Sequence, residues 1–146
     1  MKNFAVGMLL AVSMVLAGCG SDSKSGTING NWTASLTDSS NGTQVFAFTT
    51  SVIENTDGTL SISNFAFSTN SSCFVSGETE SGTFALSGDF NGHVSGSFGM
   101  KVQSGTPSGN VLNLSGTVSG NTITGTWTLT GGTGCSGSGN FTMTKM

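Results

Sequence analysis

The sequence predicts an all-β fold, a single antiparallel up-and-down β-barrel of about eight or nine strands that follows a cleaved signal peptide. Apolar residues alternate with threonine and serine at every second position, which is the period of a strand with one buried face. Short segments rich in glycine, asparagine and aspartate separate these runs, as hairpin turns do. Apolar residues at helical spacing do not extend over a dozen positions beyond the N-terminal segment, so helices are not expected in the domain.

The first 18 residues have the pattern of a signal peptide. Lys2 gives a basic start, an apolar run covers residues 4–16, and two small residues precede Cys19. The apolar run is shorter than the roughly 20 residues that a membrane-spanning helix needs. Residues 1–18 are therefore predicted to be removed from the mature protein.

The tetrapeptide Leu16-Ala17-Gly18-Cys19 ends this segment. It resembles the lipobox of bacterial lipoproteins, in which the cysteine thiol receives a diacylglyceryl group and the chain is cut before that cysteine. The resemblance implies that lipid on Cys19 anchors the protein to a membrane, and two or three acyl chains make such anchoring effectively permanent. Gly20 stands where Asp is usual in lipoproteins retained at the inner membrane of enteric-type bacteria, which favours the outer membrane. The alternative is a chance cysteine at the end of an ordinary signal peptide.

Two segments follow the predicted cleavage site. Residues 19–27 are rich in glycine and serine, which is typical of a flexible tether. Residues 28–146 have a length that suits one barrel domain. Beyond Lys2, the lysines are fewer than the carboxylates and arginine is absent, so the chain offers no basic patch to a phosphate backbone. Nucleic acid is therefore not an expected partner.

Residues 28–37 are predicted to form the first strand. Gly30-Asn31-Trp32 resembles the Gly-x-Trp first-strand signature of lipocalins and avidins, the calycin-like barrels. The resemblance covers one strand and implies the barrel architecture. It implies no ligand, because the arginine that packs on this tryptophan in the family is missing and no set of biotin-contacting residues is recognisable.

The next predicted hairpin joins residues 43–54 to residues 59–69 through a turn rich in polar residues. Along its second strand the apolar residues change parity between Ile62 and Phe65, which predicts a β-bulge near Ser63. Further strands are predicted over residues 73–79 and 138–145.

The hairpin with the best-defined register lies near the C-terminus. A turn at residues 120–121 places Leu114 opposite Trp127 and Gly116 opposite Gly125. Every apolar residue then lies on one face and the threonines on the other, and a slip of one residue would destroy this separation.

A similar hairpin precedes it. A loop over residues 91–93 would place Leu86 opposite Phe98 and Gly88 opposite Gly96. Inward glycines let strands bend sharply and leave room for a neighbouring ring, as closed barrels require. The pattern of glycine, aromatic and apolar residue at alternate positions recurs at Gly30-Trp32-Ala34, Gly82-Phe84-Leu86, Gly96-Phe98-Met100, Gly125-Trp127-Leu129 and Gly139-Phe141-Met143.

Cys73 and Cys135 are the two cysteines that remain beside Cys19. In an exported protein such a pair normally forms a disulfide, which we expect here. The alternative is two free, buried thiols.

Large side chains on the inward face are the candidate ligand-binding residues. Because these side chains alternate with glycines, the barrel interior is expected to have room for a small apolar ligand. The alternative is a fully packed core. The candidates are Trp32, Phe84, Phe98, Trp127, Phe141 and Met143.

No catalytic residue is assigned, and we expect no enzyme, cofactor or metal. His93 stands alone in a predicted loop, and Glu78 and Glu80 share one face of a strand without a partner motif. Outward threonines have high β propensity and need no further explanation. The inverse arrangement, a membrane-spanning barrel, is the minor alternative: it would need aromatic girdles that are usually rich in tyrosine, and tyrosine is absent.

These observations predict a lipid-anchored, non-enzymatic envelope lipoprotein that binds a small apolar ligand in its barrel. The alternative is a structural or protein-interaction domain of the envelope with a packed core and no ligand.

Overall fold

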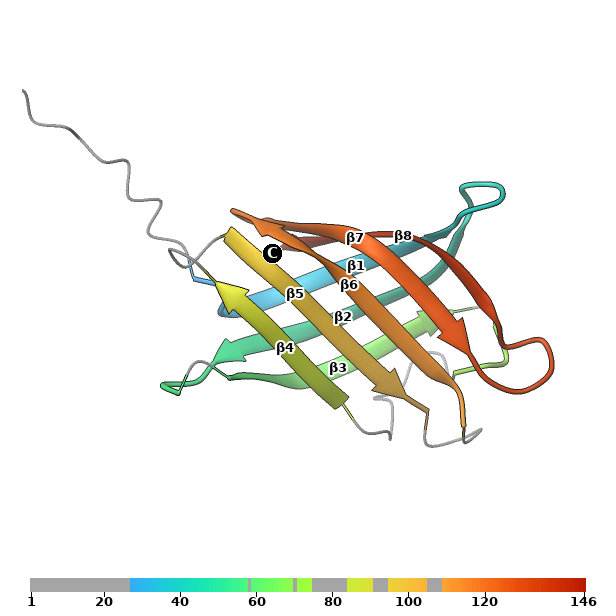
Figure 1. Cartoon of the computed structure of the whole chain (residues 1–146), viewed down its shortest axis with the longest axis horizontal. Coiled ribbons are helices and arrows are strands. Elements are labelled where there is room, and N and C mark those ends of the chain that lie inside the picture. The colour runs from blue at the N-terminus through green and yellow to red at the C-terminus, as the bar shows by residue number, and fades with distance from the viewer. Residues whose placement is uncertain (1–26, 58, 70, 75–83, 91–94, 105–108) are drawn as a thin grey trace, which may run out of the picture.

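The computed structural model describes residues 27–57, 59–69, 71–74, 84–90, 95–104 and 109–146. The predicted signal peptide, Cys19 and most of the tether lie outside this range. All regular elements among the described residues are strands (Figure 1). They are β1 (Gly30–Asp38), β2 (Gln44–Glu54), β3 (Leu60–Thr69), β4 (Phe84–Phe90), β5 (Ser95–Gln103), β6 (Val111–Ser119), β7 (Thr122–Thr130) and β8 (Gly137–Lys145).

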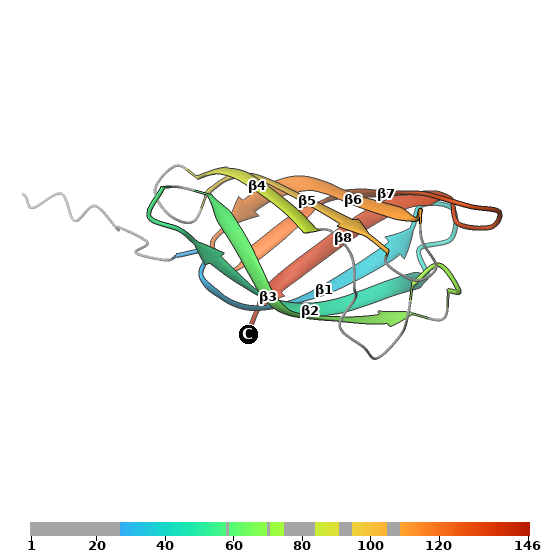
Figure 2. The ribbon, with the colours of Figure 1, turned by 90° about the horizontal axis from the view of Figure 1, so that it is seen from below.

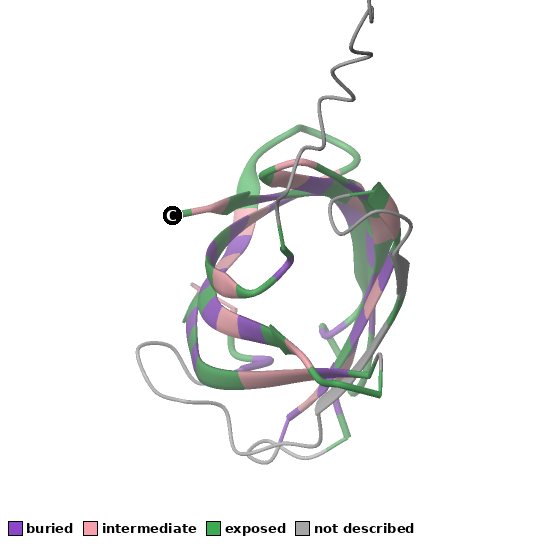
Figure 3. Cartoon of the chain, turned by 90° about the vertical axis from the view of Figure 1, so that its left-hand side faces the viewer, coloured by how far each residue is buried: buried purple, intermediate pink, exposed green. Residues whose placement is uncertain are grey.

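The eight strands form one antiparallel sheet in the order β3-β2-β1-β8-β7-β6-β5-β4. Strands that follow one another in the chain are neighbours, except β3 and β4, which form the two edges. The first and last strands pair with each other along the middle of the sheet. The sheet curls about a central axis (Figures 2 and 3). The predicted all-β, antiparallel arrangement is confirmed.

The register of the hairpin formed by β6 and β7 is the predicted one. Leu114 lies opposite Trp127 and Gly116 opposite Gly125. Gly120 in the turn has a φ of 61°, the left-handed conformation that glycine adopts readily. The alternation of apolar and polar residues together with the turn at residues 120–121 therefore predicted this pairing correctly.

The predicted register of the preceding hairpin is wrong by two residues. Gly88 lies opposite Phe98, and Phe90 lies opposite Gly96. The connection between β4 and β5 is longer than the predicted three-residue loop, because β4 ends at Phe90 and β5 begins at Ser95. In the observed register each of these glycines faces an aromatic residue instead of another glycine. A slip of two keeps every side chain on its predicted face.

The predicted bulge in β3 is confirmed. The pairing of β2 with β3 shifts where Thr49 and Ser51 face Ala66 and Ser63, so β3 has one extra residue there. Asn64 at this point has a φ of 52°. Asparagine is among the side chains that best tolerate this conformation. The bulge returns the phenylalanines that follow it to the buried face.

Two predicted strand boundaries are corrected. β1 begins at Gly30, and Ile28 precedes it as a buried residue whose carbonyl oxygen accepts a 2.8 Å hydrogen bond from Trp32 Nε1. The strand predicted over residues 73–79 does not include Cys73 and Phe74, which lie in a turn and bend after β3. Cys73 is held there by its disulfide and by a hydrogen bond to its carbonyl oxygen. Residues 75–79 lie outside the described range.

The buried residues form one core cluster on the inner face of the curled sheet, and the outward positions of the described strands are mostly threonine and serine. Figure 3 colours the chain by this burial. Full burial of a large apolar side chain stabilises a fold by about 1.5–3 kcal/mol, so this core supplies the main favourable term. Phe98, Phe141 and Trp127 each lie opposite an inward glycine of a neighbouring strand, Gly116, Gly125 and Gly139 respectively.

Candidate functional site

The predicted pocket residues belong to the core. Trp32, Phe98, Trp127, Phe141 and Met143 are all buried, each at 2 % exposure or less. They come from β1, β5, β7 and β8, and the core joins them into one cluster. Phe84 begins β4, and its side chain lies outside the described part of the chain.

At the glycines beside these residues, neighbouring atoms occupy the space that a side chain would take. A Cβ on Gly116 would collide with the carbonyl oxygen of Thr124 and would come within 3.0 Å of Phe141 Cζ. A Cβ on Gly137 would lie 3.3 Å from Trp127 Cη2, and one on Gly139 would lie 2.8 Å from Trp127 Nε1. The space left by these missing side chains is therefore filled by aromatic rings and closely approaching backbone.

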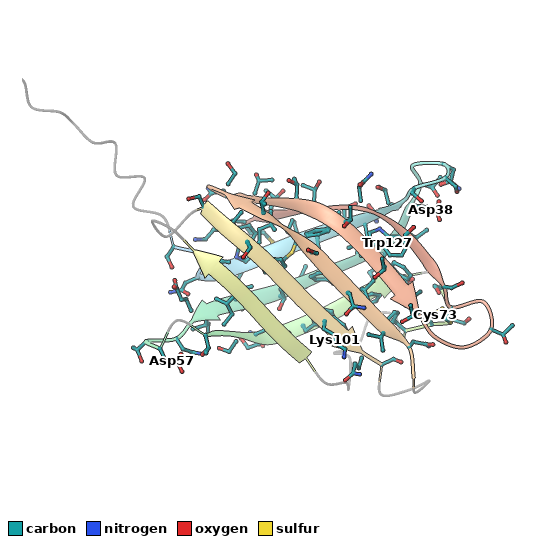
Figure 4. All side chains as sticks on the ribbon, in the orientation of Figure 1. Asp38, Asp57, Cys73, Lys101 and Trp127 are labelled. Atoms are coloured by element: carbon teal, nitrogen blue, oxygen red, sulfur yellow. A yellow bond between two sulfur atoms is a disulfide. The ribbon has the colours of Figure 1, made fainter. Side chains whose placement is uncertain are left out.

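The predicted disulfide between Cys73 and Cys135 is present. Its S–S distance is 2.10 Å and its Cα atoms are 5.6 Å apart. It joins the segment after β3 to the loop between β7 and β8. We call this end of the molecule the disulfide end; Cys73, Asp38 and Trp127 all lie toward it in Figure 4.

Asn110 connects three loops at the disulfide end. Its Nδ2 donates a 2.8 Å hydrogen bond to the carbonyl oxygen of Cys73, and its Oδ1 accepts a 3.2 Å bond from the backbone N–H of Gly132. The backbone of Asn110 bonds that of Ser104 across the base of the connection between β5 and β6. Asn110 is 3 % exposed. A buried amide with its polar atoms satisfied holds loops in a defined arrangement.

A hollow of about 160 Å³ opens beside this network. We call it the end hollow. Part of its wall is aromatic and aliphatic, and the rest is formed by polar side chains and glycines of the loops. It is lined by Asp38, Val45, Phe46, Ser71, Trp127, Leu129, Gly134, Ser136 and Gly137.

Trp127 is fixed in the wall of the end hollow by contacts on several sides. Its ring packs edge-on against Phe46, with ring centroids 5.4 Å apart and an interplanar angle of 84°. Its Nε1 donates a 2.9 Å hydrogen bond to the carbonyl oxygen of Thr37. Both interactions favour one orientation of the indole.

Asp38 is the charged side chain among the described residues of the lining. Its Oδ1 accepts hydrogen bonds from the backbone N–H and the hydroxyl of Ser40. These bonds hold the pKa of Asp38 below its ordinary value, so the group is ionised at neutral pH. Asp57 forms the same local turn with Thr59 at the opposite end, where its pKa is lowered for the same reason (Figure 4).

The remaining residues considered from the sequence give no second site. Glu78, Glu80 and His93 lie outside the described residues. Within the described ranges, no three histidine, cysteine or acidic side chains gather as metal ligands would. The described residues also contain no helix suited in length and hydropathy to crossing a membrane.

Comparison with known proteins adds no relative: no family model, curated protein or solved structure matches the chain. The site is therefore interpreted from its own geometry. Sequence reasoning selected Trp127 and the two cysteines, but it missed Asp38, Phe46 and Asn110. Asp38 and Asn110 stand in or beside turns where polar residues are common, so the sequence carries no signal for them.

Proposed function

We propose that this chain is a lipid-anchored, non-enzymatic lipoprotein of the bacterial cell envelope, serving as a structural or protein-interaction domain with a packed core. In this proposal residues 1–18 are removed, lipid is attached to Cys19, and residues 19–27 tether the domain to the outer membrane. The lipobox and the disulfide support an exported protein, since disulfides persist in oxidising compartments.

The close packing of the described core side chains is the observation that carries the choice of a packed core over an internal ligand site. Aromatic rings from β2, β3, β7 and the segment after β3 contact one another with centroid distances of 4.7–6.1 Å. Among the described inward glycines, Gly116, Gly125 and Gly139 face rings or closely approaching backbone. An apolar ligand would have to displace these contacts, which are worth about 0.5–1.5 kcal/mol per aromatic pair beyond the area that they bury.

The proposal includes closure of the curled sheet into a barrel along β3 and β4. Closure would protect two edges that otherwise invite pairing with other chains. Hydrogen exchange tests it: amides of β3 and β4 that point toward the seam should exchange as slowly as those of β7. Rapid exchange confined to the seam would contradict closure.

Lipid attachment is tested by growing cells that express the chain with labelled palmitate. We expect label in the wild-type protein and none in the Cys19→Ser variant, which should also keep its signal peptide. Label in neither protein would contradict the anchor. The Cys73→Ser variant is the control, because its thiol lies outside the lipobox.

The packed core is tested by native mass spectrometry of the protein purified as the cell makes it, in a maltoside detergent. We expect the mass of the lipidated chain alone, with no molecule taken up from a lipid extract of the same cells. A stoichiometric apolar compound would overturn the packed core in favour of the carrier that the sequence also allowed.

A further inference from the structure

We infer that the end hollow binds a small organic ammonium group, such as a tetraalkylammonium or the ammonium end of a larger molecule. The hollow opens at the disulfide end, where core residues form part of its wall. The inference does not depend on the proposed anchoring. The inference rests on the lining of the hollow, its charge, its rigidity and its place in the molecule.

The lining combines the two features that ammonium ligands need. Phe46 and Trp127, which are 4 % and 2 % exposed, contribute aromatic atoms to the wall, and Val45 and Leu129 contribute aliphatic atoms toward the alkyl groups. Cations are attracted to aromatic rings, and quaternary ammonium groups are recognised in this way. A volume of about 160 Å³ suits a group of this size rather than a long acyl chain.

The negative charge of the lining favours a positively charged ligand. Of the described residues that line the hollow, Asp38 is the one that carries a charge. Its hydrogen bonds with Ser40 favour the carboxylate, so the rim carries a negative charge at neutral pH. An anion would be repelled, and a purely apolar ligand would gain nothing from this group.

The site is built on a rigid base. The Cys73–Cys135 disulfide and Asn110 join the loops around the hollow, and the Thr37 carbonyl fixes the indole of Trp127. Rigid walls reduce the ordering cost that a small ligand would otherwise have to overcome on binding.

The hollow faces away from the start of the domain. β1 begins at Gly30, in the blue part of the ribbon in Figure 1, and ends at Asp38, which Figure 4 labels at the disulfide end. Lys145 at the end of β8 donates to the carbonyl oxygen of Thr27, so the start of β1 and the end of β8 lie opposite the disulfide end. An ammonium group would therefore reach the hollow from the side away from the predicted tether.

The two tryptophans make the test internally controlled. Each indole N–H donates to a backbone carbonyl, Trp127 to Thr37 in the wall of the hollow and Trp32 to Ile28 elsewhere in the core. We would titrate the full protein in maltoside detergent with tetramethylammonium and follow both indole N–H resonances by NMR. We expect the Trp127 resonance to shift in a saturable way while that of Trp32 stays in place.

Three comparisons decide the outcome. The uncharged choline analogue 3,3-dimethylbutanol should bind more weakly than choline, and Asp38→Asn should weaken choline binding by about fivefold or more. Asp57→Asn, which alters a matching turn at the opposite end, should leave binding unchanged. Equal binding of the uncharged analogue, an equal effect of Asp57→Asn, or no selective shift of Trp127 would each overturn the inference.

The source of the ammonium group is distinguished by a further titration. Free choline and phosphatidylcholine vesicles present the same group, and phosphatidylglycerol vesicles lack it. A Trp127 shift with choline alone identifies a soluble ligand, and a shift with phosphatidylcholine but not phosphatidylglycerol identifies a headgroup; both support the site. Shifts with both kinds of vesicle would contradict recognition of the ammonium.

Discussion

The two ends of the molecule are held together by different kinds of interaction. At the disulfide end, a covalent bond and the buried Asn110 join loops that are far apart in the chain. At the opposite end, which we call the tether end, Asn29 caps the N–H of Glu54 and Lys145 donates to the carbonyl oxygen of Thr27, all at exposed positions.

The two ends differ in whether water can replace a hydrogen bond after it breaks. Water can satisfy the exposed groups of the tether end, so each bond there contributes little net stability. The buried groups around Asn110 have no such replacement. We therefore expect the disulfide end to be the more rigid one, which is where the end hollow lies.

The largest effect should come from the disulfide. Replacing Cys73 and Cys135 together by alanine releases a loop with a sequence separation of 62. Chain-entropy arguments give a loss of about 4 kcal/mol in the free energy of unfolding for a loop of this length. Urea unfolding followed by tryptophan fluorescence measures it, and reduced wild-type protein should behave alike. A loss below about 1 kcal/mol would mean that packing alone holds this end.

The next prediction compares the two ends with one asparagine substitution at each end. Asn110→Ala leaves the carbonyl of Cys73 and the N–H of Gly132 without their partner in a buried place, which should cost about 2–3 kcal/mol. Asn29→Ala at the tether end exposes its partner to water and should cost less than about 1 kcal/mol. Urea unfolding of both variants makes the comparison. Equal losses would contradict the contrast between the ends.

Much of the fold was predictable because period-two alternation defines which face of a strand is buried. It placed Leu114 opposite Trp127 correctly, and the change of parity along β3 located the bulge near Ser63. The same alternation cannot distinguish registers that differ by two residues, since both keep each face intact. That is why Gly88 was paired with Gly96 although it faces Phe98.

The candidate site was less predictable because it forms between loops. The disulfide could be predicted because two cysteines remain beside Cys19 in a chain that is expected to be exported. Asn110 lies 37 residues from Cys73 and 22 from Gly132, and no local pattern links these positions. Only the curl of the sheet brings Phe46 on β2 against Trp127 on β7.

A smaller effect tests how tightly the disulfide end is packed. A methyl group at Gly139 would collide with the carbonyl oxygen of Thr37 and disturb its bond to Trp127, so Gly139→Ala should cost about 1–3 kcal/mol. Gly132 has no atom near the position of a Cβ, which makes Gly132→Ala the matched control with little change. Thermal unfolding by circular dichroism measures both. Similar melting temperatures for the two variants would show that the backbone and Trp127 around Gly139 move to accommodate the methyl group.

The smallest effect is the pH dependence contributed by the two turn aspartates, one at each end. Hydrogen bonds from Ser40 and Thr59 lower the pKa values of Asp38 and Asp57 in the folded protein below the ordinary 3.8. A group whose folded pKa is lowered stabilises the fold above its unfolded pKa, and this contribution disappears as pH falls through the folded pKa. Asp38→Asn and Asp57→Asn should therefore each flatten the acid side of the stability profile below about pH 4.

Carboxyl NMR titration of the wild type compares the two ends directly. Asp57 is exposed and Asp38 is half-buried, but both shifts arise within a local turn, so we expect titrations that differ little in spite of the contrast in rigidity between the ends. Tetramethylammonium should then lower the pKa of Asp38 further, because a bound cation favours the carboxylate, and leave that of Asp57 unchanged. A change in both pKa values would mean that the cation acts through general ionic screening. A change in the pKa of Asp38 alone would show that the disulfide end binds the cation and the tether end does not.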